Sequence, residues 1–120
     1  MRYLVILALT GCNILGPDIE HWSQRPLVPV PAAFADLYAA VEVCWGKRGD
    51  FGAVNWFVAD KITVDGTGRA RGTTRGDDIT IARDYLDVAR TIKHEASHHV
   101  SGRGNDIHYK GASRAICDDA

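Results

Sequence analysis

The chain has 120 residues, of which 46% are hydrophobic and 24% are charged, and its formal net charge is −1. This length accommodates one domain with a modest core and excludes a second domain of ordinary size. The nearly balanced charge and the lack of a basic run argue against nucleic acid as a partner.

The first twelve residues, MRYLVILALTGC, combine one arginine, an apolar run and a cysteine that follows small residues. This pattern is typical of a bacterial lipoprotein signal over residues 1–11, after which Cys12 is lipidated and becomes the new N-terminus. A first β-strand is the alternative interpretation, because the apolar run is short for a signal. We therefore expect an exported domain in the bacterial cell envelope, anchored by the lipid on Cys12 to a membrane at the periplasmic face or in the outer membrane.

Residues 12–31 contain all four prolines of the chain and show neither a helical nor a strand period. We expect a tether that passes into an extended arm, with His21 and Trp22 packing against the domain that follows. From Pro31 to Trp45, apolar side chains recur at spacings of three and four, which predicts a core helix ended by glycines.

Residues 51–64 alternate between apolar and polar, which predicts strands with a bend near Asp60 and Lys61. The glycine-rich residues 65–78 predict a hairpin or an irregular edge strand, and residues 79–82 predict a short strand. The order helix, strands, helix predicts an α+β fold over residues 32–120, with a small mixed or mostly antiparallel sheet, a backing helix and an active-site helix.

The active-site helix is predicted from residues 84–102, with Asp84 as its N-cap and Gly102 at its end. Its centre reads HEASHH, which contains the spacing H-E-x-x-H. Because four residues advance a helix by about 1.1 turns, His94 and His98 project from one face and can bind one Zn²⁺ ion. Glu95 is too close to act as a ligand, but it can take a proton from water as a general base.

Catalytic zinc usually has three protein ligands. No glutamate follows Glu95 in the sequence, and the compact HExxHxxGxxH pattern is absent. The remaining candidates for the third ligand are His108, which we favour, and Asp106. Tyr109 is a candidate donor to a developing oxyanion.

His99 projects about 100° away from His98, so it is predicted to be a core or supporting histidine.

After lipidation of Cys12, an even pair of cysteines remains, Cys44 and Cys117. In an oxidising compartment this pair favours a disulfide between the end of the first helix and the C-terminal tail. Zinc ligation is the competing interpretation, but neither cysteine has a close Cys or His in a CxxC-like spacing.

With these residues assembled, the chain resembles small bacterial lipoproteins of zincin type. The resemblance rests on the LTGC signal, on CWGKRGDF followed by VNWF, on the HEASHH helix, and on a downstream His108 with Cys117 nine residues beyond. It implies a zinc ion bound by His94, His98 and His108, Glu95 as general base, and a Cys44–Cys117 bridge. Tyr109 stands where members of the family often have a proline.

We therefore expect a zinc-dependent metallohydrolase, and specifically a metallopeptidase that cleaves peptide bonds with zinc-activated water and Glu95 as general base. An edge strand within residues 61–74 would hold a peptide or protein substrate by strand addition. One alternative is a catalytically idle, zinc-stabilised binding module of the envelope, which would have no use for Glu95. Hydrolysis of a non-peptide amide or ester is another.

Overall fold

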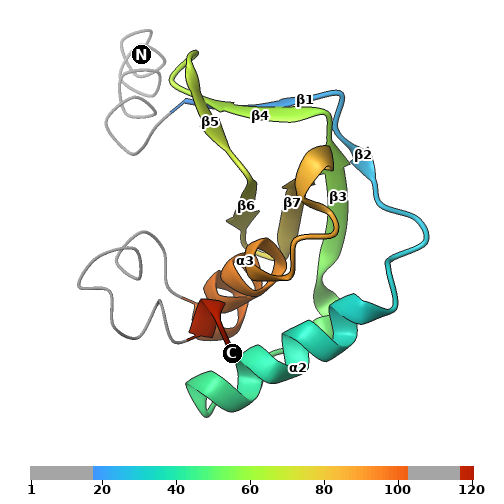
Figure 1. Cartoon of the computed structure of the whole chain (residues 1–120), viewed down its shortest axis with the longest axis vertical. Helices are drawn as coiled ribbons and strands as arrows, with labels where there is room; N and C mark the ends of the chain where they lie inside the picture. Colours follow the sequence, from blue (N-terminus) through green and yellow to red (C-terminus); the bar gives the residue numbers. More distant parts are fainter. Residues whose placement is uncertain (1–17, 103–116) are drawn as a thin grey trace, which may run out of the picture.

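A computed structural model describes residues 18–102 and 117–120 (Figure 1). Its helices are α2 (Ala33–Trp45) and α3 (Ala89–Ser101), with short 3-10 turns η1 (Phe51–Ala53) and η2 (Arg83–Tyr85). Its strands are β1 (Ile19–Trp22), β2 (Arg25–Pro26), β3 (Asn55–Ala59), β4 (Lys61–Val64), β5 (Gly68–Ala70), β6 (Gly72–Arg75) and β7 (Asp78–Ala82). The predicted signal and the candidate residues Cys12, Asp106, His108 and Tyr109 lie outside the described residues.

The strands form two small sheets, and the chain bends and passes from one sheet to the other at three places. One sheet is antiparallel with the order β1-β4-β5, and the other has the order β2-β3-β7-β6 and contains one parallel pair, β3 with β7. Between β1 and β2, between β3 and β4, and between β5 and β6, one or two residues carry the chain from one sheet to the other. The bend predicted near Asp60 is confirmed, and Asp60 accepts hydrogen bonds from Arg25 and Arg83 at 3.2 and 3.3 Å.

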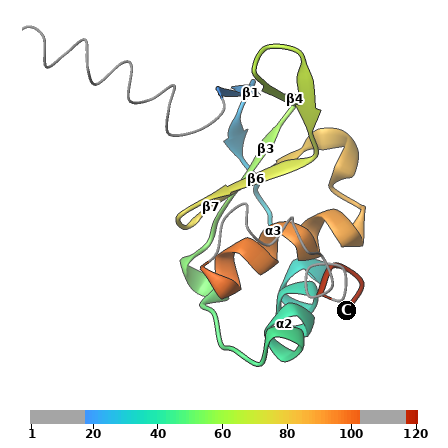
Figure 2. The same ribbon diagram turned by 90° about the vertical axis from the view of Figure 1, so that its left-hand side faces the viewer.

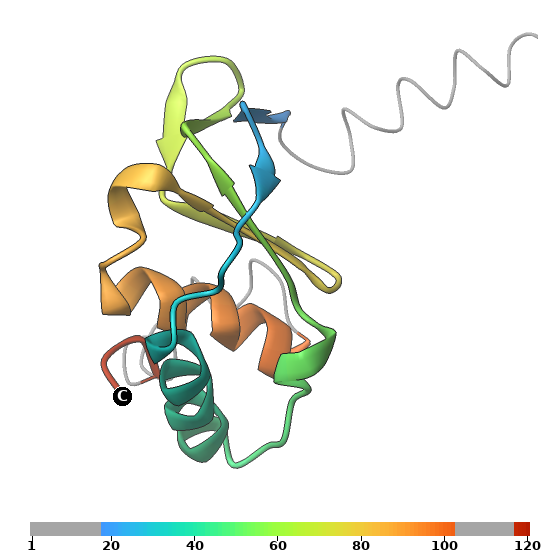
Figure 3. The ribbon, with the colours of Figure 1, turned by 90° about the vertical axis from the view of Figure 1, so that its right-hand side faces the viewer.

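Both helices lie on the same side of the four-stranded sheet, with α3 next to the strands and α2 beyond α3 (Figures 2 and 3). Helix α3 contacts β6 and β7, and α2 packs against α3. Helix α2 also reaches the sheet through Phe34, whose ring lies 4.8 Å from that of Trp56. The chain is therefore an α+β domain, as the element order predicts, but its two helices pack on two small sheets and not on the single small sheet of the prediction.

The main core lies between these helices and the four-stranded sheet. Apolar side chains on the inner faces of α2 and α3, three or four residues apart, pack on inward side chains of β3 and β7, which alternate along each strand. This packing excludes water from the core. The buried members are Phe34, Tyr38, Val41, Val54, Trp56, Ile79, Ile81, Ile92, Ala96 and Val100. The predicted helix over residues 31–45 and the predicted inward face of β3 are confirmed.

The N-terminal arm is more ordered than its composition predicts. Strand β1 pairs with β4 over four residues, and β2 adds an edge to β3. The arm does pack against the domain, but the lack of a strand period in the sequence was misleading. The arm lies at the edges of both sheets, where backbone pairing needs no alternating apolar pattern.

The predicted start of the active-site helix is wrong by four residues, because the N-cap is Val88 and not Asp84. Asp84 lies in η2, and α3 begins at Ala89 after an extended Val88 (φ −98°, ψ 100°). The chain turns here because Tyr85 and Leu86 pack against the core. The predicted end is confirmed, since Gly102 adopts φ 68° and its N–H donates to the carbonyl of His98 at 3.0 Å.

No helix within residues 18–102 and 117–120 is long and apolar enough to span a bilayer.

Candidate metal centre

His94 and His98 lie one turn apart on α3, on the side away from its buried residues Ile92 and Ala96. Their ring centroids are 5.0 Å apart, with an angle of 83° between the ring planes. Both histidines are partly exposed. The helix therefore holds two imidazoles close together at the surface, which is the arrangement that the H-E-x-x-H spacing predicts.

A carboxylate from the other end of the chain lies behind His94. The two oxygens of Asp118 lie 3.0 and 3.2 Å from Nδ1 of His94. An ionised carboxylate can only accept hydrogen bonds, so this contact requires a proton on Nδ1 of His94. A histidine held in this way ligates a metal through Nε2, with the carboxylate fixing the tautomer and the ring orientation.

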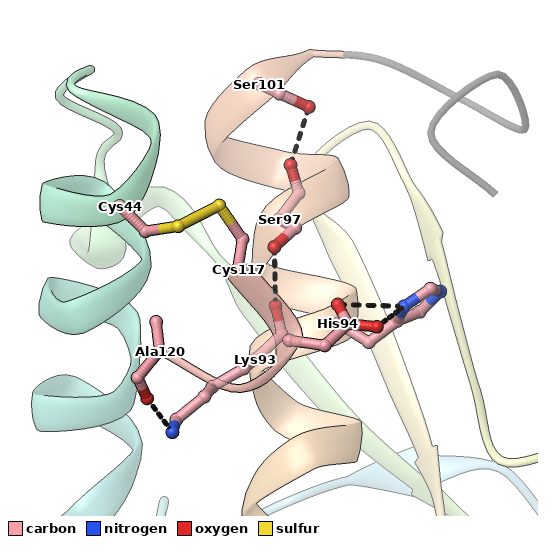
Figure 4. Close-up of a disulfide and its surroundings, with 8 residues drawn as sticks. Cys44, Lys93, His94, Ser97, Ser101, Cys117 and Ala120 are labelled. Atoms are coloured by element: carbon pink, nitrogen blue, oxygen red, sulfur yellow. Dashed lines mark hydrogen bonds and ion pairs between the residues drawn. A yellow bond between two sulfur atoms is a disulfide. The ribbon is translucent and has the colours of Figure 1, made fainter. Parts of the chain in front are cut away.

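Asp118 reaches this position because the C-terminal tail is attached to both helices (Figure 4). Cys117 forms a disulfide with Cys44 at the end of α2, with the two Cα atoms 5.6 Å apart, so the predicted bridge is present. On the other side of Asp118, Nζ of Lys93 donates to the carbonyl of Ala120. These attachments flank Asp118 and direct its side chain toward His94.

Glu95 points into the protein, against strand β6. It is 5% exposed, and the hydroxyl of Thr74 lies 2.8 Å from its Oε1 and 3.1 Å from its carbonyl oxygen. Gly72 provides room for the side chain, because a Cβ at this position would lie 2.8 Å from Cγ of Glu95.

Burial raises the pKa of the Glu95 carboxyl, while the Thr74 hydrogen bond and the nearby His94 and His98 lower it. A carboxyl whose pKa is moved toward neutrality is better matched to general base chemistry than an ordinary surface glutamate.

His99, the neighbour of His98, is a partly buried supporting histidine, which is one of the two roles predicted for it. Its side chain is 8% exposed, its Nδ1 lies 2.7 Å from the hydroxyl of Tyr38, and its Nε2 lies 2.9 Å from Asp77. Since the Asp77 carboxylate accepts from Nε2, Nδ1 of His99 accepts the proton of Tyr38. His99 thus links α2 to the turn between β6 and β7.

The arrangement fits a metal ion in part. The carboxylate–histidine pair at His94 and the neighbouring ring of His98 are typical of a zinc site. Within residues 18–102 and 117–120, no group of three potential ligands is close enough to hold an ion. The predicted third ligands, His108 and Asp106, fall outside those ranges.

Three contributors to this site were missed by sequence reasoning: Asp118, Thr74 and Gly72. The signal available for Asp118 was its place directly after a cysteine expected to bridge to α2. Thr74 and Gly72 carry no such signal, because the glycine-rich pattern of residues 65–78 predicts only a hairpin or an irregular edge strand.

Comparison of the chain with protein-family models, curated proteins and solved structures finds no match. The H-E-x-x-H motif and the geometry of these side chains are therefore the features of the chain that indicate a function.

Proposed function

We propose that the chain is a zinc-dependent metallohydrolase of zincin type, most specifically a metallopeptidase. The observation that supports this most strongly is the combination on α3 of two neighbouring imidazoles, one backed by Asp118, with a buried Glu95 between them in sequence. A structural zinc site has no need for a buried glutamate at that position, whereas hydrolysis requires a base.

In this proposal His94 and His98 hold the ion together with His108. Bound zinc supplies Lewis acidity, which brings the pKa of a water toward neutrality and polarises a carbonyl. Glu95 accepts a proton from the attacking water at its carboxylate and then donates it to the amine nitrogen of the leaving group. Thr74 and Gly72 fix the carboxylate for both transfers, through a hydrogen bond and through space for the side chain.

The proposed substrate is a peptide or protein segment bound in an extended conformation. Strand β6 lies at the edge of the four-stranded sheet, and its residues 72–74 fall in the range 61–74 expected to present such an edge. Its residues 72 and 74 contact Glu95, so a peptide added to this edge would bring its backbone close to the general base. Strand addition gives affinity through backbone hydrogen bonds and leaves sequence preference to the side chains.

We also propose that lipidated Cys12 holds the domain on a membrane of the bacterial envelope. The motif LTGC supports this. The check is the mass of the N-terminal peptide after expression in a bacterial host, compared with that of a Cys12→Ser variant.

The test of activity pairs zinc analysis with cleavage of a broad peptide library. Three proteins are compared: the parent protein (residues 13–120), its Glu95→Gln variant and the control variant Glu20→Gln. Glu20 is an exposed glutamate of β1, so its variant should behave like the parent protein. We expect one zinc per chain in all three, with cleavage lost only in Glu95→Gln.

Zinc in all three proteins without cleavage in any of them would favour the zinc-stabilised binding module. If the parent protein takes up no zinc, the metallohydrolase proposal is wrong.

A further inference from the structure

Asp118 is a buried acidic residue in the C-terminal tail, followed directly by two exposed residues. It is 5% exposed, whereas its neighbour Asp119 has a side chain that is 61% exposed. Burying a carboxylate is costly unless it is paired and hydrogen-bonded. The Nδ1 atom of His94 lies 3.0 Å from one of its oxygens, so this contact is what compensates its burial.

The disulfide is the strongest of the attachments that hold Asp118 in place. Cys117 directly precedes Asp118 and is itself 3% exposed. The ion pair of Asp119 with Arg90 measures 3.6 Å between largely exposed side chains, and such pairs contribute little. The covalent bond to Cys44 on α2 therefore determines where the tail lies relative to α3.

We propose that Asp118 is a positioning residue for the metal centre and that the Cys44–Cys117 disulfide acts on metal affinity through it. This inference rests on the proposed function, because it needs the metal centre at His94. It adds a role for the C-terminal tail. The disulfide holds Asp118 against His94, and Asp118 holds the imidazole of His94 in the tautomer that ligates through Nε2.

The proposal predicts a ranking of zinc affinities. Loss of a carboxylate that orients a ligating histidine typically lowers metal affinity by about 10- to 100-fold. We expect Asp118→Ala to fall in this range, and Asp118→Asn to be intermediate because its amide oxygen can still accept from Nδ1. The matched control is Asp119→Asn, the exposed neighbour, which should stay within about twofold of the parent protein because it does not contact His94.

The role of the disulfide is tested by non-additivity. The double variant Cys44→Ser, Cys117→Ser should lose zinc affinity in the Asp118→Ala range. Adding Asp118→Ala to that double variant should cause little further loss, because the two changes remove the same contact. Affinities are measured on residues 13–120 by competition with a chromophoric zinc chelator.

A second readout separates positioning from general destabilisation. Long-range ¹H–¹⁵N spectra of the zinc-loaded protein should show a proton on Nδ1 of His94, with a shift that changes in Asp118→Ala and not in Asp119→Asn. Thermal unfolding of each variant without zinc identifies any that do not fold. If Asp118→Ala does not fold, the shift of the Nδ1 proton of His94 is compared between Asp118→Asn and the parent protein instead.

The outcomes distinguish this proposal from the one on which it rests. If the parent protein binds no zinc, both are wrong. If it binds zinc and Asp118→Ala binds equally tightly, only the role of Asp118 is wrong. Fully additive losses from the disulfide and Asp118 variants would overturn the link between the bridge and His94.

Discussion

The hydroxyl of Thr74 lies 2.8 Å from Oε1 of Glu95, and this hydrogen bond joins the edge strand β6 to the proposed general base. The two residues are 21 positions apart in the sequence and lie on different elements, Thr74 on β6 and Glu95 on α3. Through this contact, the strand proposed to bind substrate also fixes the direction of the carboxylate proposed as general base.

Thr74→Val should therefore impair both stability and cleavage. Valine keeps the shape of threonine but cannot donate a hydrogen bond, and a bond to a charged group contributes about 1.5–3 kcal/mol. We expect a comparable loss in the free energy of unfolding, and about a tenfold lower kcat/KM, equivalent to about 1.4 kcal/mol. The matched control is Thr74→Ser, which retains the hydroxyl. Equal losses in the two variants would mean that the hydrogen bond is not responsible.

Gly72→Ala should displace Glu95. The new methyl carbon would lie 2.8 Å from Cγ and 3.2 Å from Cδ of Glu95, which is too close for either side to stay in place. Overpacking of this kind costs about 1–3 kcal/mol. Urea unfolding should show this loss, and cleavage should fall with it.

Gly52→Ala is the control for Gly72→Ala, because the nearest atom to its added methyl carbon, Oδ1 of Asp50, lies 3.4 Å away. Its stability should stay within about 0.5 kcal/mol of the parent protein. A Gly72→Ala variant with unchanged stability and activity would contradict the close packing of β6 on Glu95.

Tyr38→Phe should destabilise the fold without changing the proposed zinc binding. The hydroxyl of Tyr38 donates to Nδ1 of His99 and lies 3.1 Å from the backbone nitrogen of Asp50, and the residue is 1% exposed. Unpaired buried polar groups cost about 1–3 kcal/mol each, so we expect a loss of about 2 kcal/mol. Zinc content should not change, because His99 is not a proposed ligand.

The control is Tyr85→Phe, which removes a hydroxyl that forms no hydrogen bond within the described part of the chain. It should have little effect on the unfolding midpoint. Loss of zinc from Tyr38→Phe at temperatures where it remains folded would assign His99 a direct part in the metal centre.

His21 should make stability depend on pH. Its Nε2 lies 2.8 Å from Oγ1 of Thr73, and its pKa is lowered by burial and then by the charge of Arg75. The unfolded chain therefore binds a proton at His21 more readily than the folded protein does. The free energy of unfolding should consequently fall as the pH falls below about 6.5 and continue to fall until the folded pKa is passed.

His21→Gln should reduce this dependence, as measured by urea unfolding between pH 7 and pH 5 with a chelator present to keep metal out. The neighbouring variant Glu20→Gln keeps His21 and should retain the slope of the parent protein. Identical slopes in all three proteins would show that His21 does not titrate differently in the folded state.

The sequence by itself determined those helices and strands in which apolar residues recur at a regular spacing. The spacing of apolar residues from Phe34 to Trp45 predicted α2, the alternation around Trp56 predicted β3, and the HEASHH spacing predicted two histidines on one helical face. Each of these depends on neighbours within one or two turns or along one strand, so the chain itself carries the information. The same local pattern placed the start of α3 too early, because Tyr85 and Leu86 pack into the core and turn the chain first.

Tertiary structure alone decided what surrounds the motif. Asp118 lies against His94 across 24 residues, and Thr74 and Gly72 lie against Glu95 from a strand with no recognisable pattern. These contacts exist because the disulfide ties the tail to α2 and because β6 pairs with β7 and lies across α3. No periodicity records such pairings, since they depend on how sheets, helices and a covalent bridge fit together in space.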